Sequence, residues 1–96
     1  MLSHIPINLE DVKKEDIDKE ILRIAMIAEL DAVSLYEQLA STAQSGEVKK
    51  ILLDVAKEEK THVGEFQTLL LSRDEEQVRE LEKGRKEVEE ELKGLK

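Results

Sequence analysis

Residues 48–70 carry apolar side chains at the spacing of one helix face, and two ionisable residues interrupt that face. The pair is Glu59 and His62, three residues apart. At about 100° per residue, the pair falls on the same side of a helix as the apolar residues. Burying these two groups costs several kcal/mol unless something binds them. Because residues three apart stand side by side on a helix, both can reach one metal ion. The apolar members are Val48, Ile51, Leu52, Val55, Val63, Phe66, Leu69 and Leu70.

Composition favours an all-α fold that associates with copies of itself. The chain has 96 residues, of which 40% are charged and 40% apolar, with one proline and two aromatic residues. Such a chain is typical of helices and argues against a sheet sandwich or barrel. A domain of this length buries a modest core on its own. We therefore expect one small helical domain that self-associates.

Three segments are expected along the chain. Residues 1–14 contain the proline and no sustained apolar period, so we predict an irregular N-terminal arm with a turn after Asn8. Residues 15–72 are predicted to form two helices, about 15–43 and 47–71, whose short connection makes them an antiparallel hairpin. Residues 73–96 are predicted to form a charged C-terminal segment, whose helix runs from about the N-cap residue Asp74 to about Lys93. Its apolar seam is narrow, so we interpret it as an arm or a connector to a longer polypeptide.

The first predicted helix carries a carboxylate inside an apolar arc. Glu29 and Tyr36 are seven residues apart, which is about two turns, so they share a side of the helix. An antiparallel hairpin then brings Glu29 opposite Glu59 and His62. The apolar arc is wider than one partner helix can cover. A second copy of the chain would cover the remainder.

Counting ligands gives half of a two-metal site. In four-helix bundles a carboxylate-bridged pair of metals takes a Glu from each of two helices and a Glu-x-x-His from each of the other two. One chain supplies one of each, namely Glu29 and the pair Glu59 and His62. The homodimer is therefore the predicted minimal functional unit. Carboxylates with an imidazole suit iron or manganese, and affinity alone does not exclude zinc or cobalt. We expect iron, as two Fe²⁺/Fe³⁺ ions per dimer.

Several classes of function are disfavoured. The sequence has no Cys, which removes disulfides and thiolate metal sites. A formal charge of -8 argues against nucleic-acid binding. No apolar run approaches the roughly 20 residues needed to cross a membrane. We therefore predict a cytoplasmic protein that binds neither nucleic acid nor membrane, and we expect no role for His4 in the arm.

Two segments together resemble the encapsulated ferritins, two-helix relatives of ferritin that work inside encapsulin shells. They are residues 29–36, ELDAVSLY, and residues 58–62, EEKTH, and the resemblance extends over residues 15–93. It implies a ferritin-like four-helix bundle of two subunits and a ring of such dimers. It also implies storage of iron mineral in a surrounding encapsulin shell, and hence a location in a cytoplasmic nanocompartment.

The same resemblance implies a ferroxidase. Glu29, Glu59 and His62 of two subunits would bind two Fe²⁺, and dioxygen would oxidise them to Fe³⁺. Tyr36 matches a tyrosine next to the metal centre of the family, and Asp31 matches an acidic residue on its iron access route.

The sequence also departs from the family pattern. Ala28 stands where the family has a second acidic residue on the access route, and Leu35 stands where it has an aromatic residue. The C-terminus lacks the short apolar tail with which separate cargo proteins dock on the shell. Some relatives that this chain resembles are fused ahead of the shell protein, so the missing tail raises the hypothesis that residues 1–96 are a domain of such a longer chain, with separate cargo as the alternative.

Simpler explanations stay open for each residue. Glu59 and His62 could be satisfied by hydrogen bonds from neighbouring helices, and Tyr36 could be a core tyrosine with no redox role. A solvated position on the helix flank suffices for Asp31. Two other functions are therefore kept beside the ferroxidase: a metal-binding or metal-buffering module without turnover, and a structural helical assembly domain.

Overall fold

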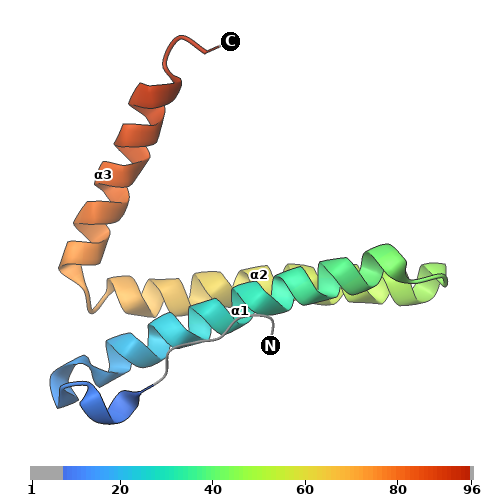
Figure 1. The fold of residues 1–96 in the computed structure, drawn as a ribbon, viewed down its shortest axis with the longest axis horizontal. Coiled ribbons are helices and arrows are strands. Elements are labelled where there is room, and N and C mark those ends of the chain that lie inside the picture. The colour runs from blue at the N-terminus through green and yellow to red at the C-terminus, as the bar shows by residue number, and fades with distance from the viewer. Residues whose placement is uncertain (1–7, 96) are drawn as a thin grey trace.

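The computed structural model describes residues 8–95, which form three α-helices and two single turns of 3-10 helix (Figure 1). No strand occurs in this part of the chain, which confirms the all-α prediction. None of its helices is long and apolar enough to cross a lipid bilayer. The elements are η1 (Leu9–Asp11), η2 (Lys14–Asp16), α1 (Ile17–Thr42), α2 (Gly46–Leu71) and α3 (Glu75–Leu92).

The helices begin and end within two residues of the expected positions. The turn expected after Asn8 is η1, whereas η2 was not expected. It arises because Ile17, the residue that closes η2, already has helical backbone angles, so the turn runs directly into α1. Residues 1–7 of the predicted arm, including His4, lie outside the described residues.

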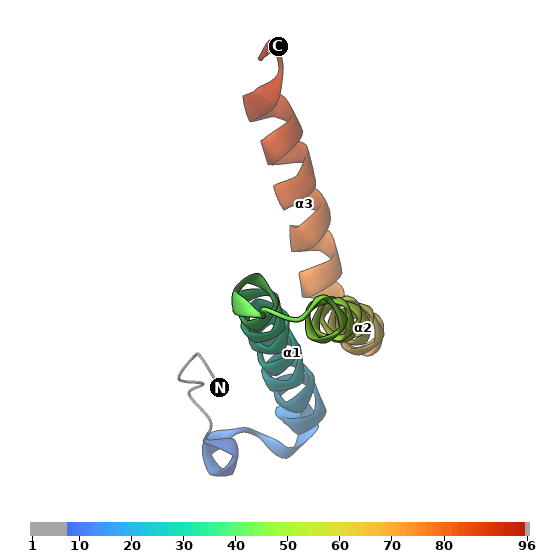
Figure 2. The same ribbon diagram turned by 90° about the vertical axis from the view of Figure 1, so that its right-hand side faces the viewer.

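Short-range signals explain how the hairpin of α1 and α2 turns. Ala43 ends α1 with an extended backbone, and Ser45 caps α2 by accepting a hydrogen bond from the Val48 N–H at 3.3 Å. Such a cap satisfies one of the N–H groups left unpaired at a helix start. This short turn lets the two helices run antiparallel and side by side, as Figures 1 and 2 show together.

The buried core of the hairpin is small. Within residues 8–95 its five members come from the facing sides of α1 and α2, and no polar or charged residue of this range is buried with them. Two of the five are alanines, which let the helix backbones approach closely. Large apolar side chains elsewhere on both helices stay exposed, so the hairpin alone leaves apolar surface uncovered. The core residues are Leu22, Val33, Ala40, Ala56 and Leu70.

The third helix projects away from the hairpin (Figures 1 and 2). Asp74 caps α3 by accepting a hydrogen bond from the Gln77 N–H at 3.0 Å, as the sequence predicts. Beyond the first turns of α3 the apolar side chains are exposed, at 57% for Val88 and 55% for Leu92. The helix therefore packs against the hairpin only near its base.

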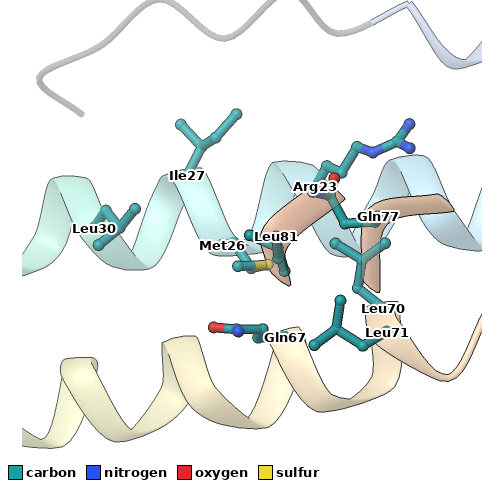
Figure 3. A pocket seen from close by; sticks show the side chains of 9 residues that line it. All are labelled: Arg23, Met26, Ile27, Leu30, Gln67, Leu70, Leu71, Gln77 and Leu81. Atoms are coloured by element: carbon teal, nitrogen blue, oxygen red, sulfur yellow. The ribbon is translucent and has the colours of Figure 1, made fainter. Parts of the chain in front are cut away.

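An apolar groove of about 310 Å³ lies in the corner between the hairpin and the base of α3 (Figure 3). All three helices line it, and none of the candidate metal ligands does. Leu81 reaches into it from α3, opposite side chains of α1 and α2. The remaining lining residues are Arg23, Met26, Ile27, Leu30, Gln67, Leu70, Leu71 and Gln77.

Gly64 lies inside α2, where an alanine is expected to stabilise the protein. A Cβ placed on Gly64 meets no atom within 4 Å. Glycine costs about 1 kcal/mol relative to alanine in a helix interior. Gly64→Ala should therefore raise the free energy of unfolding by about 1 kcal/mol, measured by denaturant titration. Gly46→Ala, at the first position of α2, is the control and should change it less. An unchanged or lowered stability of Gly64→Ala would contradict the prediction.

Candidate metal centre

The hairpin brings together the three residues that the sequence singled out. Glu29 comes from α1, and Glu59 and His62 come from α2. Each offers one ligand atom, and these atoms all lie within 4.8 Å of one another. Glu59 and His62 meet because they are one helical turn apart. Glu29 meets them because the antiparallel pairing of α1 and α2 places it opposite that turn of α2.

The imidazole Nδ1 of His62 is the point where the cluster converges. It lies 3.3 Å from Glu59 Oε2 and 3.4 Å from Glu29 Oε2. A neutral imidazole can donate one hydrogen from this atom, so it cannot bond well to both carboxylates. Two carboxylate oxygens and an imidazole nitrogen around one point form a donor set that suits a divalent cation.

Glu29 provides a test of whether these residues fit a metal. Its Oε2 atom is shielded from solvent and has no hydrogen-bond partner in the described residues. The contact with His62 is close, but it lacks the alignment of a hydrogen bond. Leaving a buried acceptor unsatisfied costs about 1–3 kcal/mol, and more when the group is charged. A cation bound at this atom would remove that cost, so the residues fit a metal.

The cluster is less buried in one chain than the sequence suggested. The side chains of Glu29 and Glu59 are 20% and 18% exposed, and that of His62 is 42% exposed. His62 stands at the edge of the hairpin, on the side of α2 that also carries Ile51 and Leu69. These two apolar residues are 61% and 48% exposed. Folding of a single chain therefore leaves this side of the hairpin uncovered.

The two auxiliary candidates lie outside the cluster. Tyr36 is half-buried on α1 and, within residues 8–95, its hydroxyl forms no hydrogen bond with Glu29. Asp31 is half-buried, and its position is about 200° around α1 from Glu29, so it belongs to another side of the helix. Neither residue contributes a ligand atom to the cluster.

Two polar contacts between distant residues were missed in the sequence. Lys60 Nζ of α2 lies 3.2 Å from Glu37 Oε2 of α1. Arg23 of α1 pairs with Asp74 at the start of α3, with Nη2 and Oδ2 2.9 Å apart. The N-cap role of Asp74 was readable from its position before a helix. Its pairing with a residue 51 positions earlier was not, because no local pattern encodes that contact.

Comparisons with known proteins agree with this fold. The sequence profile of the rubrerythrin family matches residues 20–95. The chain is 63% identical over 71 residues to a ferritin-like-encapsulin shell fusion protein from Pyrococcus furiosus. That match covers 74% of this chain but 21% of the relative, so the chain spans about a fifth of that protein's length.

A solved structure resembles the whole chain. It is the crystal structure of the encapsulated ferritin domain from Pyrococcus furiosus, with a TM-score of 0.81 and 53% sequence identity. The match covers 100% of this chain and 99% of the solved one. Sequence and structure thus agree over the hairpin and α3 together. The chain belongs to the rubrerythrin family of ferritin-like proteins and shares the fold of the encapsulated ferritin domain.

Proposed function

We propose that two copies of this chain form a ferroxidase centre that oxidises Fe²⁺ with dioxygen. Glu29, Glu59 and His62 of each copy would bind the Fe²⁺ substrate. The observation that carries this proposal is the convergence of their three ligand atoms within 4.8 Å, with Glu29 Oε2 shielded and without a hydrogen-bond partner in the described residues.

Two copies are needed because one chain offers too few ligands for two ions. Among the described residues, one group of carboxylates and imidazole is placed to hold a metal. A bundle with two metals needs twice that set. His62 lies at an exposed edge beside apolar residues. Two hairpins that meet at this edge across a two-fold axis would complete the site and cover the apolar surface.

The reaction moves electrons from iron to oxygen. Each Fe²⁺ loses one electron, and O₂ takes up two electrons and two protons to give hydrogen peroxide, or four of each to give water. The carboxylates of Glu29 and Glu59 favour the higher charge of Fe³⁺, which lowers the cost of losing an electron. The imidazole of His62 binds as the neutral base.

The relatives support a role together with an encapsulin shell. One is a fusion of a ferritin-like protein to an encapsulin shell, and another is an encapsulated ferritin domain. We infer that this chain works as a ring of dimers inside an encapsulin nanocompartment in the cytoplasm. Fe³⁺ produced at the centre would be stored there as mineral.

Anaerobic loading followed by air tests the proposal. Native mass spectrometry with Fe²⁺ should show even numbers of subunits with two irons per dimer. Admitting air to protein with excess Fe²⁺ should then produce Fe³⁺ absorbance and consume oxygen. The amount of Fe²⁺ oxidised per dimer should be well above two, which shows turnover. If iron binds but oxidises no faster than free Fe²⁺ in buffer, the chain is a metal-binding module without turnover.

Metal should also stabilise the assembled protein. A ligand that binds the folded form alone adds about 2.7 kcal/mol at one hundred times its dissociation constant. Anaerobic Fe²⁺ is therefore expected to raise the melting temperature, measured by calorimetry at fixed protein concentration. Mg²⁺ is the control, because it prefers oxygen ligands and keeps its waters, and it should raise the temperature far less. If neither the melting temperature nor the subunit number changes when Fe²⁺ is added, the result would favour a structural assembly domain.

A further inference from the structure

The direction of α3 has to be set at its N-terminal end. The helix has 18 residues and so is about 27 Å long. Its outer apolar residues are exposed, and its contacts with the hairpin lie near its base. A change of about 10° at the base would move the far end by about 5 Å over such a length. Small contacts at the base therefore decide where most of α3 lies.

The turn between α2 and α3 is held by bonds that are local to α2. The Ser72 hydroxyl donates to the Leu69 carbonyl at 2.7 Å, and Arg73 Nη1 donates to the same carbonyl at 3.2 Å. Both bonds close the last turn of α2. Neither reaches α1 or α3, so they do not set the angle between α3 and the hairpin.

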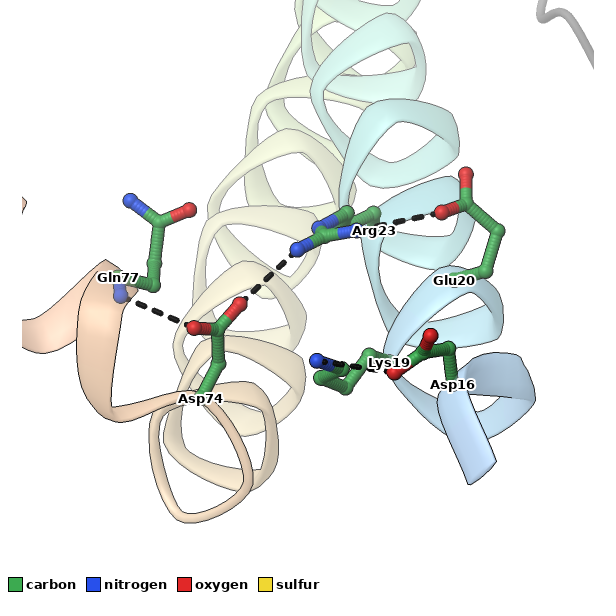
Figure 4. Close-up of polar contacts among 6 residues, drawn as sticks. All are labelled: Asp16, Lys19, Glu20, Arg23, Asp74 and Gln77. Carbon is green, nitrogen blue, oxygen red and sulfur yellow. Dashed lines mark hydrogen bonds and ion pairs between the residues drawn. The ribbon is translucent and has the colours of Figure 1, made fainter. Parts of the chain in front are cut away.

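Asp74 bonds to two different elements with its two carboxylate oxygens (Figure 4). Oδ1 accepts the hydrogen bond from the Gln77 N–H in the first turn of α3, at 3.0 Å. Oδ2 accepts from Arg23 Nη2 of α1 at 2.9 Å. Arg23 is itself held on α1, because its Nη1 donates to Glu20 Oε2 at 3.2 Å. A single carboxylate thus joins the start of α3 to a side chain that is braced on α1.

The carboxylate of Asp74 is charged and largely enclosed. Its side chain is 11% exposed. The Gln77 N–H has the largest effect and lowers the pKa of Asp74, while partial burial raises it. The positive charges of Lys19 and Arg23 lower the pKa further, and the result lies below the ordinary value. The group therefore remains ionised at neutral pH and able to pair with Arg23.

We propose that the Arg23–Asp74 ion pair is a latch that fixes the direction in which α3 leaves the hairpin. The N-cap ties the axis of α3 to Asp74, and the ion pair ties Asp74 to α1. The latch therefore decides where the exposed side chains of α3 lie relative to the rest of the molecule. Its action does not depend on metal binding.

The latch can be tested with spin labels, because the chain has no Cys. Cysteines at Gln38 and Glu90, both exposed, would carry one label on α1 and one on α3. Double electron–electron resonance then measures the distance between them. An excess of unlabelled protein in the sample restricts the signal to pairs within one chain. Arg23→Gln should broaden the distance distribution or shift it by about 5 Å, the displacement expected from a change of about 10° at the base of α3.

Three further variants separate the latch from other roles of these residues. Asp74→Ser keeps a good N-cap but removes the ion pair, so it should behave like Arg23→Gln. Arg23→Lys keeps the charge and should restore part of the narrow distribution. Arg85→Gln is the matched control, because it removes ion pairs with Glu82 and Glu89 that lie within α3 alone. Circular dichroism should show an unchanged helix content in all variants.

Salt provides a measurement that needs no substitution. At 1 M ionic strength the Debye length falls to about 3 Å, comparable to the 2.9 Å between Arg23 Nη2 and Asp74 Oδ2, and the Arg23 side chain is 44% exposed to the salt. High salt should therefore broaden the unsubstituted distribution towards that of Arg23→Gln. Distributions that stay narrow and unshifted in Arg23→Gln, in Asp74→Ser and in high salt would overturn the proposal. So would an equal broadening in Arg85→Gln.

Discussion

Replacing Glu59 or His62 with alanine is expected to reduce iron oxidation to the rate of free Fe²⁺ in buffer. Each change removes one of the three ligand atoms that converge in the hairpin. Because two chains are proposed to share one centre, a single substitution in the sequence deletes two ligands from each site. Glu29→Ala should have the same effect, since it removes the shielded oxygen that has no hydrogen-bond partner in the described residues.

The measurement needs two readouts and matched controls. Fe³⁺ absorbance after mixing with air reports oxidation, and native mass spectrometry reports bound iron and subunit number. Glu58→Ala and Glu65→Ala are the controls, because both remove an exposed carboxylate from α2 close to the cluster. Both should oxidise iron at nearly the unsubstituted rate. Comparable loss in these controls would show that general acidity, rather than the cluster, attracts the iron.

Glu59→Gln separates a ligand from a residue that only fixes the packing register. The amide has nearly the shape of the carboxylate and still accepts hydrogen bonds, but it carries no charge. If Glu59 is a metal ligand, Glu59→Gln should lose oxidation almost as completely as Glu59→Ala. Its subunit number should stay the same. Full oxidation by Glu59→Gln would contradict the ligand role and favour the structural explanation.

Replacing Leu70 with alanine is expected to have the largest effect on stability. Leu70 is 4% exposed and is one of five buried apolar residues in the described chain. A buried Leu→Ala change typically costs about 2–5 kcal/mol, and small domains are stable by about 5–15 kcal/mol. The substitution should therefore remove a large part of the total, measured as a lowered midpoint of denaturant unfolding.

Leu53→Ala is the matched control for Leu70→Ala. Leu53 lies on the same helix and is 43% exposed, so truncation should cost much less. Both variants must be compared at one protein concentration, because the stability of an assembling protein depends on it. Equal losses in the two variants would show that association surfaces, rather than the hairpin core, dominate the stability.

The helices were predictable because each is encoded by neighbouring residues. The period of the apolar residues predicted α1 and α2, and Asp74, which was predicted as the N-cap of the third helix, lies at the observed start of α3. The extra turn η2 was not predicted, because three residues are too few to show a period. The small core was also unpredicted in detail, since the sequence does not tell which apolar residues face the partner helix and which stay exposed.

The candidate cluster was predictable in part. Glu59 and His62 lie on one helix, so their spacing alone places them together. Glu29 could be matched to them once the hairpin was inferred from a short loop. The exposure of His62 was not predictable, because it depends on how α2 is rotated about its own axis relative to α1. The roles of Tyr36 and Asp31 stay predictions, since neither joins the cluster.

Neighbouring residues along the chain encode three helices, an antiparallel hairpin, and a Glu-x-x-His pair that lies on one turn of one helix. Features that depend on helix orientation follow instead from tertiary packing. This packing set the shielding of Glu29 Oε2, the half-exposed edge at His62 and the pairing of Arg23 with Asp74. The physical reason is that helical spacing is periodic and local, whereas the rotation and angle between helices follow from contacts between residues far apart in the chain.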